Sequence, residues 1–168
     1  GKKLESVIRQ ACEMGVHHIT PVASTYCIAS VVADEKRSAH KTQRFEAQVR
    51  EALQQSGSRI TTQVHPTITL QELIKTWDTS STGIFFHQAQ ENSPSLGEVL
   101  AHYRTQQETA APLALLIGPE GGFSADECEA LLRCGFHGVL LKTNILRAET
   151  ASLYAIAAVQ SLILETNT

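Results

Sequence analysis

No long uninterrupted hydrophobic run occurs in the 168-residue sequence, and basic residues are not in excess. A membrane-spanning helix needs about 20 consecutive apolar residues, so we expect no span. The N-terminal segment has the pattern of an amphipathic helix and not of a signal peptide. The formal net charge is −3, whereas a domain that neutralises many phosphates usually carries a basic excess. We therefore expect a globular cytoplasmic protein that contacts any nucleic acid only locally.

Paired cysteine motifs are also missing. The four cysteines show no C-x-x-C spacing and accompany no histidine tract; they are Cys12, Cys27, Cys128 and Cys134. Neither a zinc site nor a disulfide framework is favoured by this pattern. We expect reduced thiols, as is usual in the cytoplasm, and no metal.

What the sequence contains is typical of one α/β domain over residues 1–168. The spacing of apolar residues predicts helices over residues 3–14, 36–55 and 148–164, the last apolar enough to be buried. Ser/Thr-x-x-Glu capping boxes predict three more helix starts, at Thr69 with Glu72, Ser95 with Glu98 and Ser124 with Glu127. Short apolar runs predict strands at residues 16–24, 59–64, 83–87, 112–117 and 137–141. This alternation indicates a mostly parallel sheet flanked by helices, with ligands bound in the loops after the strands.

The first candidate site is the loop GPEGG, residues 118–122, between a predicted strand and a capped helix. Glycines permit positive φ angles and let the main chain approach a ligand closely. The pattern is neither G-x-G-x-x-G nor a P-loop, and Glu120 would repel a phosphate. A neutral or cationic nucleoside therefore fits this loop better than a nucleotide, although a plain strand-to-helix turn explains the glycines equally well.

The second candidate site is the segment that leaves the strand at residues 137–141 and enters the last helix. Arg147 and Glu149 place two charges beside an apolar helix. Such charges are costly near a core unless they are hydrogen-bonded or used in function. A structural ion pair and a functional role are both compatible with the sequence.

Taken together, the two segments resemble a known family. GPEGG at residues 118–122 and ILRAETA at residues 145–151 are similar to the paired signature of RsmE-type methyltransferases in the SPOUT superfamily. RQACEMGVHHITPV at residues 9–22 and REALQQSGSR at residues 50–59 also resemble family segments. The similarity spans nearly the whole chain. It implies methylation of N3 of a uridine in 16S ribosomal RNA of the small subunit.

The resemblance further implies a SPOUT fold with a C-terminal deep trefoil knot, S-adenosylmethionine as cofactor and a homodimer. The apolar last helix is the candidate surface for self-association. The cofactor-binding residues that it implies are Phe86, His87, Ile117, Gly118, Pro119, Glu120, Gly121, Gly122, Leu140, Leu141, Ile145, Leu146 and Arg147. Arg147 is the expected catalytic residue, because its guanidinium can stabilise an anionic uracil or its phosphate without accepting a proton. The proton acceptor stays open among solvent, Glu120 and Glu149. His87 is either a weaker acid/base candidate or a packed residue at a strand end.

Basic residues concentrate in one part of the chain, namely Arg37, Lys41, Arg44 and Arg59. They are candidate contacts to the ribosomal RNA, although a solvated helix face explains them equally well. The N-terminal PUA-like domain of family members is not expected within this chain.

One departure from the family pattern concerns the second loop. The family usually has Leu-Gly-x-Arg where this chain has Leu141, Lys142, Thr143 and Asn144, so a glycine and an arginine are lost. Two other functions stay open: a ribose 2′-O methyltransferase of the same superfamily, and a non-catalytic RNA-binding module that retains the fold.

Overall fold

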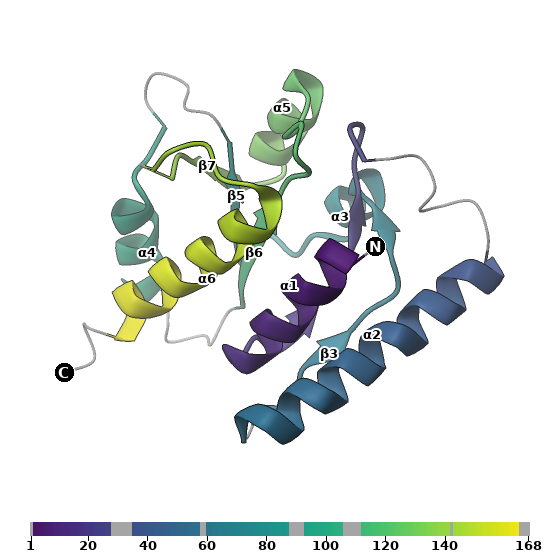
Figure 1. The fold of residues 1–168 in the computed structure, drawn as a ribbon. Helices are drawn as coiled ribbons and strands as arrows, with labels where there is room; N and C mark the ends of the chain where they lie inside the picture. The colour runs from purple at the N-terminus through teal and green to yellow at the C-terminus, as the bar shows by residue number, and fades with distance from the viewer. Residues whose placement is uncertain are drawn as a thin grey trace. The chain divides into compact units, whose positions relative to one another are not determined.

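The computed structural model describes residues 2–27, 35–57, 60–87, 93–105, 112–141 and 143–164. The chain divides into two compact units, Gly1–Leu70 and Gln71–Thr168 (Figure 1). Each unit contains its own parallel strands and its own hydrophobic cluster. Within the described part of the chain, none of the helices has the length and apolar character of a membrane span.

The first unit places two helices against short parallel strands. Its elements are α1 (Lys2–Glu13), β1 (His18–Ile19), β2 (Val22–Ala23), α2 (Glu35–Ser56), β3 (Gln63–Val64) and β4 (Ile68–Thr69). β1 pairs with β3 and β2 pairs with β4, both in parallel. The apolar faces of α1 and α2 meet in a core of Ile8, Cys12, Phe45, Val49 and Ala52. The predicted helices over residues 3–14 and 36–55 are thereby confirmed.

The predicted strand over residues 16–24 is interrupted in the structure. Pro21 lies between β1 and β2, and it has no amide hydrogen to donate to a strand ladder. Its carbonyl instead accepts a hydrogen bond from the amide of Ile68 at 3.0 Å. The chain therefore changes partner at Pro21, from β3 to β4. The prediction of one continuous strand was wrong because a proline at this position prevents regular pairing.

The second unit is built around a three-stranded parallel sheet in the order β6-β5-β7. The elements from residue 70 onward are α3 (Leu70–Thr76), β5 (Thr82–Phe86), α4 (Leu96–Thr105), β6 (Leu113–Ile117), α5 (Ala125–Arg133), β7 (Phe136–Val139) and α6 (Ala148–Leu164). Strands and helices alternate along the chain, as predicted for an α/β fold with parallel strands. The capping boxes expected at Ser95 and Ser124 are both present.

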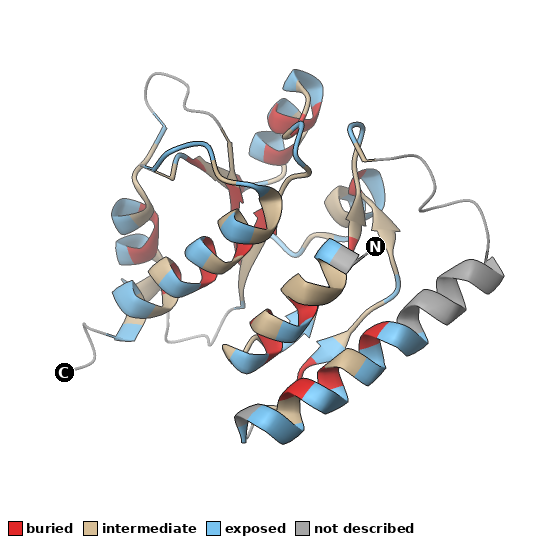
Figure 2. Ribbon diagram, viewed as in Figure 1, coloured by how far each residue is buried: buried red, intermediate tan, exposed pale blue. Residues whose placement is uncertain are grey.

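Helices cover both faces of this sheet. α4 and α6 pack on one face, where Ile84, Val99, Leu100, Val139 and Val159 form a buried cluster (Figure 2). On the other face, α5 packs beside β7. Side chains of successive strand residues point to opposite faces, so β5 contributes to both layers.

α6 is less buried than its composition predicts. Ser152, Ala155, Ile156 and Val159 are buried, but Tyr154 is 46% exposed. Leu162 and Leu164 are also exposed. The prediction of a buried helix therefore holds for one face of α6 only, because a single layer of α4 and sheet covers it.

Candidate functional site

Both candidate loops emerge at one edge of the β6-β5-β7 sheet. Phe86 of β5 is paired with Ile117 of β6 on one side and with Val139 of β7 on the other. Neighbouring strands lie about 4.8 Å apart, so Ile117 and Val139 are separated by roughly 10 Å across Phe86. The loops that follow β6 and β7 therefore start close together. Ligands of parallel α/β sheets bind at such an edge.

The loop at residues 118–122 is a tight turn. The amide of Gly122 donates to the carbonyl of Pro119 at 2.8 Å and closes the turn. Gly122 has a φ of +69°, in the left-handed region that favours glycine. Glu120 and Gly121 lie exposed at the tip. The turn therefore offers main-chain groups to a ligand with little interference from side chains.

The two ends of this turn are in close contact. A Cβ atom on Gly118 would lie 3.1 Å from the ring of Phe123 and 3.3 Å from the Cα atom of Gly122. Phe123 is buried, and its ring packs edge-to-face on Phe85 with the centroids 6.0 Å apart. Phe123 therefore joins the turn to the central strand of the sheet.

The helix that follows the turn begins with a complete capping box. Glu127 Oε2 accepts from the amide of Ser124 at 2.8 Å, and Ser124 Oγ accepts from the amide of Glu127 at 3.2 Å. Glu127 is buried, which is unusual for a carboxylate. Burial, and then the charge of Glu127, raise the pKa of the neighbouring Cys128 thiol. Cys128 therefore stays protonated and is a poor nucleophile.

The second loop, residues 140–147, exposes apolar side chains. Ile145 is 94% exposed and Leu140 is 41% exposed. Leu141 and Leu146 are half-buried. Exposed aliphatic side chains beside a glycine turn provide a surface that a flat apolar group can cover.

The residues that depart from the family pattern lie in the same loop. The amide of Thr143 donates to the carbonyl of Leu141 at 2.7 Å, and Thr143 Oγ1 donates to the carbonyl of Asn144 at 2.9 Å. Lys142 lies outside the described residues. These bonds hold the described residues on either side of Lys142, and none of Leu141, Thr143 and Asn144 is a glycine.

Arg147 ends this loop at the start of α6. Its carbonyl accepts from the amide of Ala151 at 2.8 Å, while its side chain is exposed. In the first turn of α6, the Oε2 atom of Glu149 is buried. The guanidinium is thus accessible to solvent, whereas part of the neighbouring carboxylate faces the protein interior.

Phe86 and His87 lie between the two loops, at the end of the central strand. The amide of His87 donates to the carbonyl of Val139 at 3.2 Å, which extends the pairing of β5 with β7 by one residue. The ring centroid of His87 is 6.3 Å from that of Phe85. Both Phe86 and His87 are half-buried. The structure therefore brings all three groups of predicted cofactor-binding residues to one edge of the sheet.

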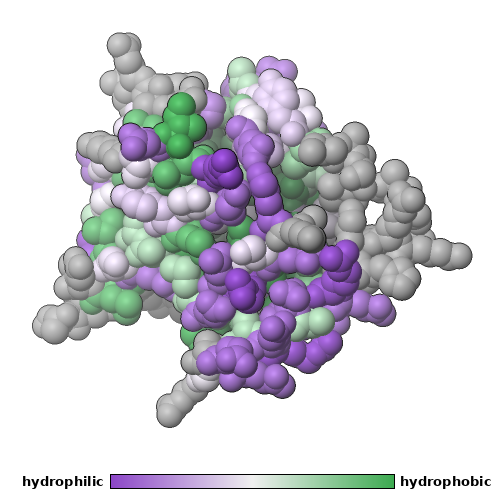
Figure 3. Space-filling model, in the orientation of Figure 1, coloured by the Kyte–Doolittle hydropathy of each residue, from purple (hydrophilic) through white to green (hydrophobic). Residues whose placement is uncertain are grey.

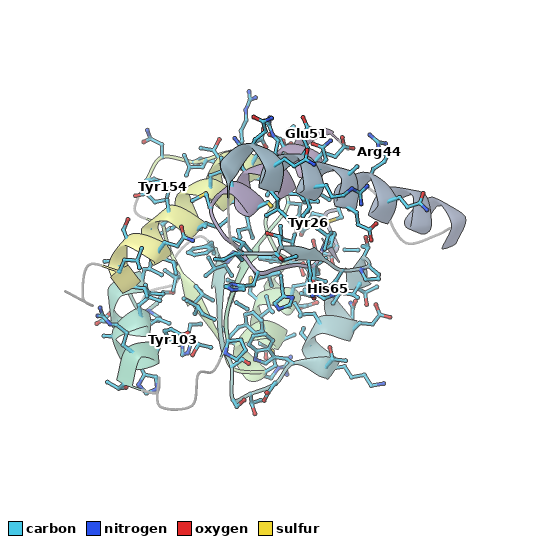
Figure 4. All side chains as sticks on the ribbon, turned by 90° about the horizontal axis from the view of Figure 1, so that it is seen from below. Tyr26, Arg44, Glu51, His65, Tyr103 and Tyr154 are labelled. Carbon is cyan, nitrogen blue, oxygen red and sulfur yellow. The ribbon has the colours of Figure 1, made fainter. Side chains whose placement is uncertain are left out.

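The predicted RNA-binding residues belong to the first unit. Arg44 extends from α2, where its Nη2 atom donates to Glu5 Oε1 of α1 at 2.6 Å (Figure 4). Arg44 therefore joins two helices, and its charge is partly compensated. The side chains of Arg37 and Lys41, and the whole of Arg59, lie outside the described residues.

Comparison with known proteins identifies the family. The RNA methyltransferase domain family matches residues 1–160. The chain belongs to this family. The ribosomal RNA small subunit methyltransferase E of Bacillus subtilis (strain 168) is 30% identical over 166 residues, which are 95% of this chain and 61% of that protein. Methyltransferase E 2 of Borreliella burgdorferi is 28% identical, over 99% of this chain and 64% of its own length.

A solved structure agrees with the RNA methyltransferase domain assignment. The crystal structure of the Neisseria gonorrhoeae ribosomal RNA small subunit methyltransferase E, bound to S-adenosyl methionine, superposes with a TM-score of 0.80 at 30% identity. The match covers 96% of this chain and 62% of that one. The resemblance to RsmE-type enzymes is thereby confirmed. This chain spans less than two thirds of the length of these relatives.

Two residues that hold the glycine turn of the candidate site in place were not among the predicted site residues. They are Phe123, whose ring lies against Gly118 and Phe85, and Glu127, whose carboxylate accepts from the amide of Ser124 directly after the turn. The Ser-x-x-Glu capping box was a visible signal for Glu127. Phe123 carries no such signal, because its contact with Phe85 joins positions that are distant in the sequence.

Proposed function

We propose that this chain is the cofactor-binding and catalytic part of an S-adenosylmethionine-dependent methyltransferase that acts on N3 of a uridine in 16S ribosomal RNA. The observation that carries the proposal is the meeting of the turn 118–122 and the segment 140–147 at one edge of the sheet. The RNA methyltransferase family and the Neisseria relative bound to S-adenosyl methionine support it. The names of the relatives support a small-subunit ribosomal RNA substrate.

The residues at this edge fit S-adenosylmethionine. The turn presents main-chain groups at its exposed tip, Glu120 and Gly121, which suit recognition of an adenine or a ribose by the backbone. Leu140 and Ile145 expose apolar surface that an adenine ring would remove from water. Glu120 at the tip favours a positively charged ligand over a phosphate.

Arg147 has the chemical properties that the reaction requires. Bound S-adenosylmethionine supplies an electrophilic methyl group. Uridine N3 carries a proton and is a poor nucleophile near neutral pH, so the uracil must be deprotonated and aligned. The exposed guanidinium of Arg147 can stabilise the anionic uracil or hold its phosphate, and it remains charged throughout.

The acceptor of the N3 proton is one of three groups. Glu120 lies exposed on the turn, and Glu149 lies in the first turn of α6. Solvent is the third candidate. Glu120→Gln and Glu149→Gln remove one carboxylate each, so a loss of methylation in only one of them identifies the acceptor, and activity in both assigns the role to solvent.

We also infer a trefoil knot in the second unit. β7 lies on one side of β5, whereas α6, which follows β7, packs against β6 on the other side. The chain over residues 140–147 therefore crosses the end of β5 (Figure 1). This crossing supports the threading that the family resemblance implies. A crystal structure in which the chain carrying α6 does not pass through a loop of the second unit would contradict the knot.

The proposed partners are the small ribosomal subunit and a second copy of this chain, in the cytoplasm. Exposed apolar side chains on α6 support a two-fold interface there. Figure 3 shows hydrophobic residues over α6 and the segment before it, and mainly hydrophilic residues over α1 and α2.

No metal is proposed. Among the described residues, His, Cys, Asp and Glu side chains form no group of three or more that could hold one.

Methyl transfer to small ribosomal subunits tests the proposed function. With labelled S-adenosylmethionine, we expect labelled N3-methyluridine after digestion of the 16S ribosomal RNA. A labelled 2′-O-methyl nucleoside would instead assign the chain to the ribose methyltransferases. Cofactor binding without transfer would contradict the catalytic role.

A variant pair tests the assignment of Arg147. Arg147→Ala is expected to lower the rate of methyl transfer by about 100-fold, as when a group that stabilises developing charge is removed. Arg133→Ala is the matched control, because Arg133 is an exposed arginine at the C-terminal end of α5 whose guanidinium lies 3.5 Å from the carboxylate of Glu129. An unchanged rate in Arg147→Ala would remove Arg147 from the mechanism.

A further inference from the structure

Two helices of the second unit begin with the same capping box, but only one box has a buried carboxylate. At α4, Ser95 and Glu98 exchange hydrogen bonds of 2.7 Å and 3.2 Å, and Glu98 is exposed. At α5, the equivalent bonds of Ser124 and Glu127 are 2.8 Å and 3.2 Å, and Glu127 is only 6% exposed. Burying a carboxylate costs free energy, and the α4 box shows that capping does not require it. The burial of Glu127 therefore calls for a role beyond capping.

That role follows from what the α5 box holds in place. The Ser124 amide that Glu127 binds comes directly after Phe123. The ring of Phe123 packs on Phe85 of the central strand, at an interplanar angle of 83°, and also lies against Gly118 at the far end of the turn. A displacement of Ser124 would move Phe123 and would disturb the turn at both of its ends.

We propose that Glu127 is a positioning residue, whose buried carboxylate holds the turn 118–122 in the shape that binds S-adenosylmethionine. This inference rests on the proposed function and adds to it the residue that controls cofactor affinity. Glu127 acts through Ser124 and Phe123, and the main chain of the turn makes the contacts to the cofactor.

The size of the effect follows from the population of the correctly shaped turn. Without the carboxylate, the turn can adopt other shapes, and the apparent dissociation constant rises in inverse proportion to the fraction that remains competent. The loss of a helix cap corresponds to a change of about fivefold to tenfold in such an equilibrium. We expect a rise of that order for Glu127→Ala. Glu127→Gln keeps an acceptor oxygen for the Ser124 amide and should stay within about threefold of the wild type.

Calorimetric titration with S-adenosylmethionine, together with the melting temperature of each protein, separates positioning from stability. Arg104→Ala is the matched control, because Nη1 of Arg104 donates to the carbonyl of Leu162 at 3.2 Å, at the end of α6 opposite Arg147. Arg104→Ala should lower the melting temperature and leave the dissociation constant unchanged. Without cofactor, the amides of residues 120–123 should exchange hydrogen faster in Glu127→Ala than in the wild type, and at the wild-type rate in Arg104→Ala.

The outcomes distinguish the inference from the function on which it rests. Wild-type affinity in Glu127→Ala overturns the inference alone, and so does an equal loss of affinity in Arg104→Ala. No binding by the wild type overturns the proposed function and the inference together. If Glu127→Ala does not fold, Glu127→Asp replaces it, because the shorter side chain cannot reach the Ser124 amide in the same geometry. Wild-type affinity in Glu127→Asp then counts against the inference.

Discussion

At the scale of single residues, Gly118 is a position where the turn leaves little room for a side chain. A methyl group there would meet the ring of Phe123 at 3.1 Å and the main chain of Gly122 at 3.3 Å. Gly118→Ala should lower the free energy of unfolding by roughly 1–3 kcal/mol, as overpacking usually does. It should also raise the dissociation constant for S-adenosylmethionine. Urea denaturation and calorimetry measure the two effects.

Gly97 provides the control for this prediction. It lies in α4, and a Cβ atom built there meets nothing within 4 Å. Gly97→Ala should therefore be neutral or should stabilise the protein by about 0.5–1 kcal/mol, with unchanged cofactor affinity. If Gly118→Ala behaves like Gly97→Ala, the close approach at the turn has no energetic importance.

His137 makes the stability of the second unit depend on pH. Burial, and then the charge of His102, lower the pKa of His137 below its ordinary value of 6.5. The His137 side chain therefore takes up a proton at a higher pH in the unfolded chain than in the folded chain. The neutral His137 contributes stability that is fully present above pH 6.5 and is lost as the pH falls through the pKa of the folded state. The melting temperature should fall from pH 7.5 to pH 5.5. His137→Gln should reduce that fall, and an identical fall in both proteins would contradict the assignment.

At the scale of elements, α4 holds the end of α6. The last carbonyl groups of a helix have no partner within the helix, and Arg104 of α4 donates a hydrogen bond to the carbonyl of Leu162. Arg104→Ala should lower the free energy of unfolding by about 1 kcal/mol in urea denaturation. Arg133→Ala removes only an exposed pair within α5 and should change it by less than about 0.5 kcal/mol. Equal effects of the two substitutions would show that Arg104 adds nothing as a cap.

The elements also show how far sequence reasoning reaches. The capping box at Ser124 predicted the start of α5, because both of its hydrogen bonds lie within four positions of the chain. The prediction at residues 16–24 failed at Pro21, where the change of strand partner depends on residues more than forty positions away. The partner of Arg44 was missed for the same reason, since Glu5 is 39 positions distant.

At the scale of the whole molecule, the exposed face of α6 predicts self-association. Tyr154 projects from this helix (Figure 4), and Tyr154→Glu would place a charge in the proposed two-fold interface. Light scattering after size-exclusion chromatography should give twice the 18.3 kDa chain mass for the wild type and a single chain mass for Tyr154→Glu. Tyr26→Glu is the control, because Tyr26 is a similarly exposed tyrosine of the first unit. A monomeric wild type would end the dimer proposal.

The sequence by itself determined the helices, the alternation of strands with helices and the family, because these depend on periodicity, capping and motifs that neighbouring residues carry. Only the tertiary structure decided that β5 lies between β6 and β7 and that the two loops consequently meet beside Phe86. It also decided that Glu127 is buried while Ile145 is exposed. Strand order and burial depend on contacts between distant positions, and their free energy is settled by the packing of the whole unit, which no local pattern records.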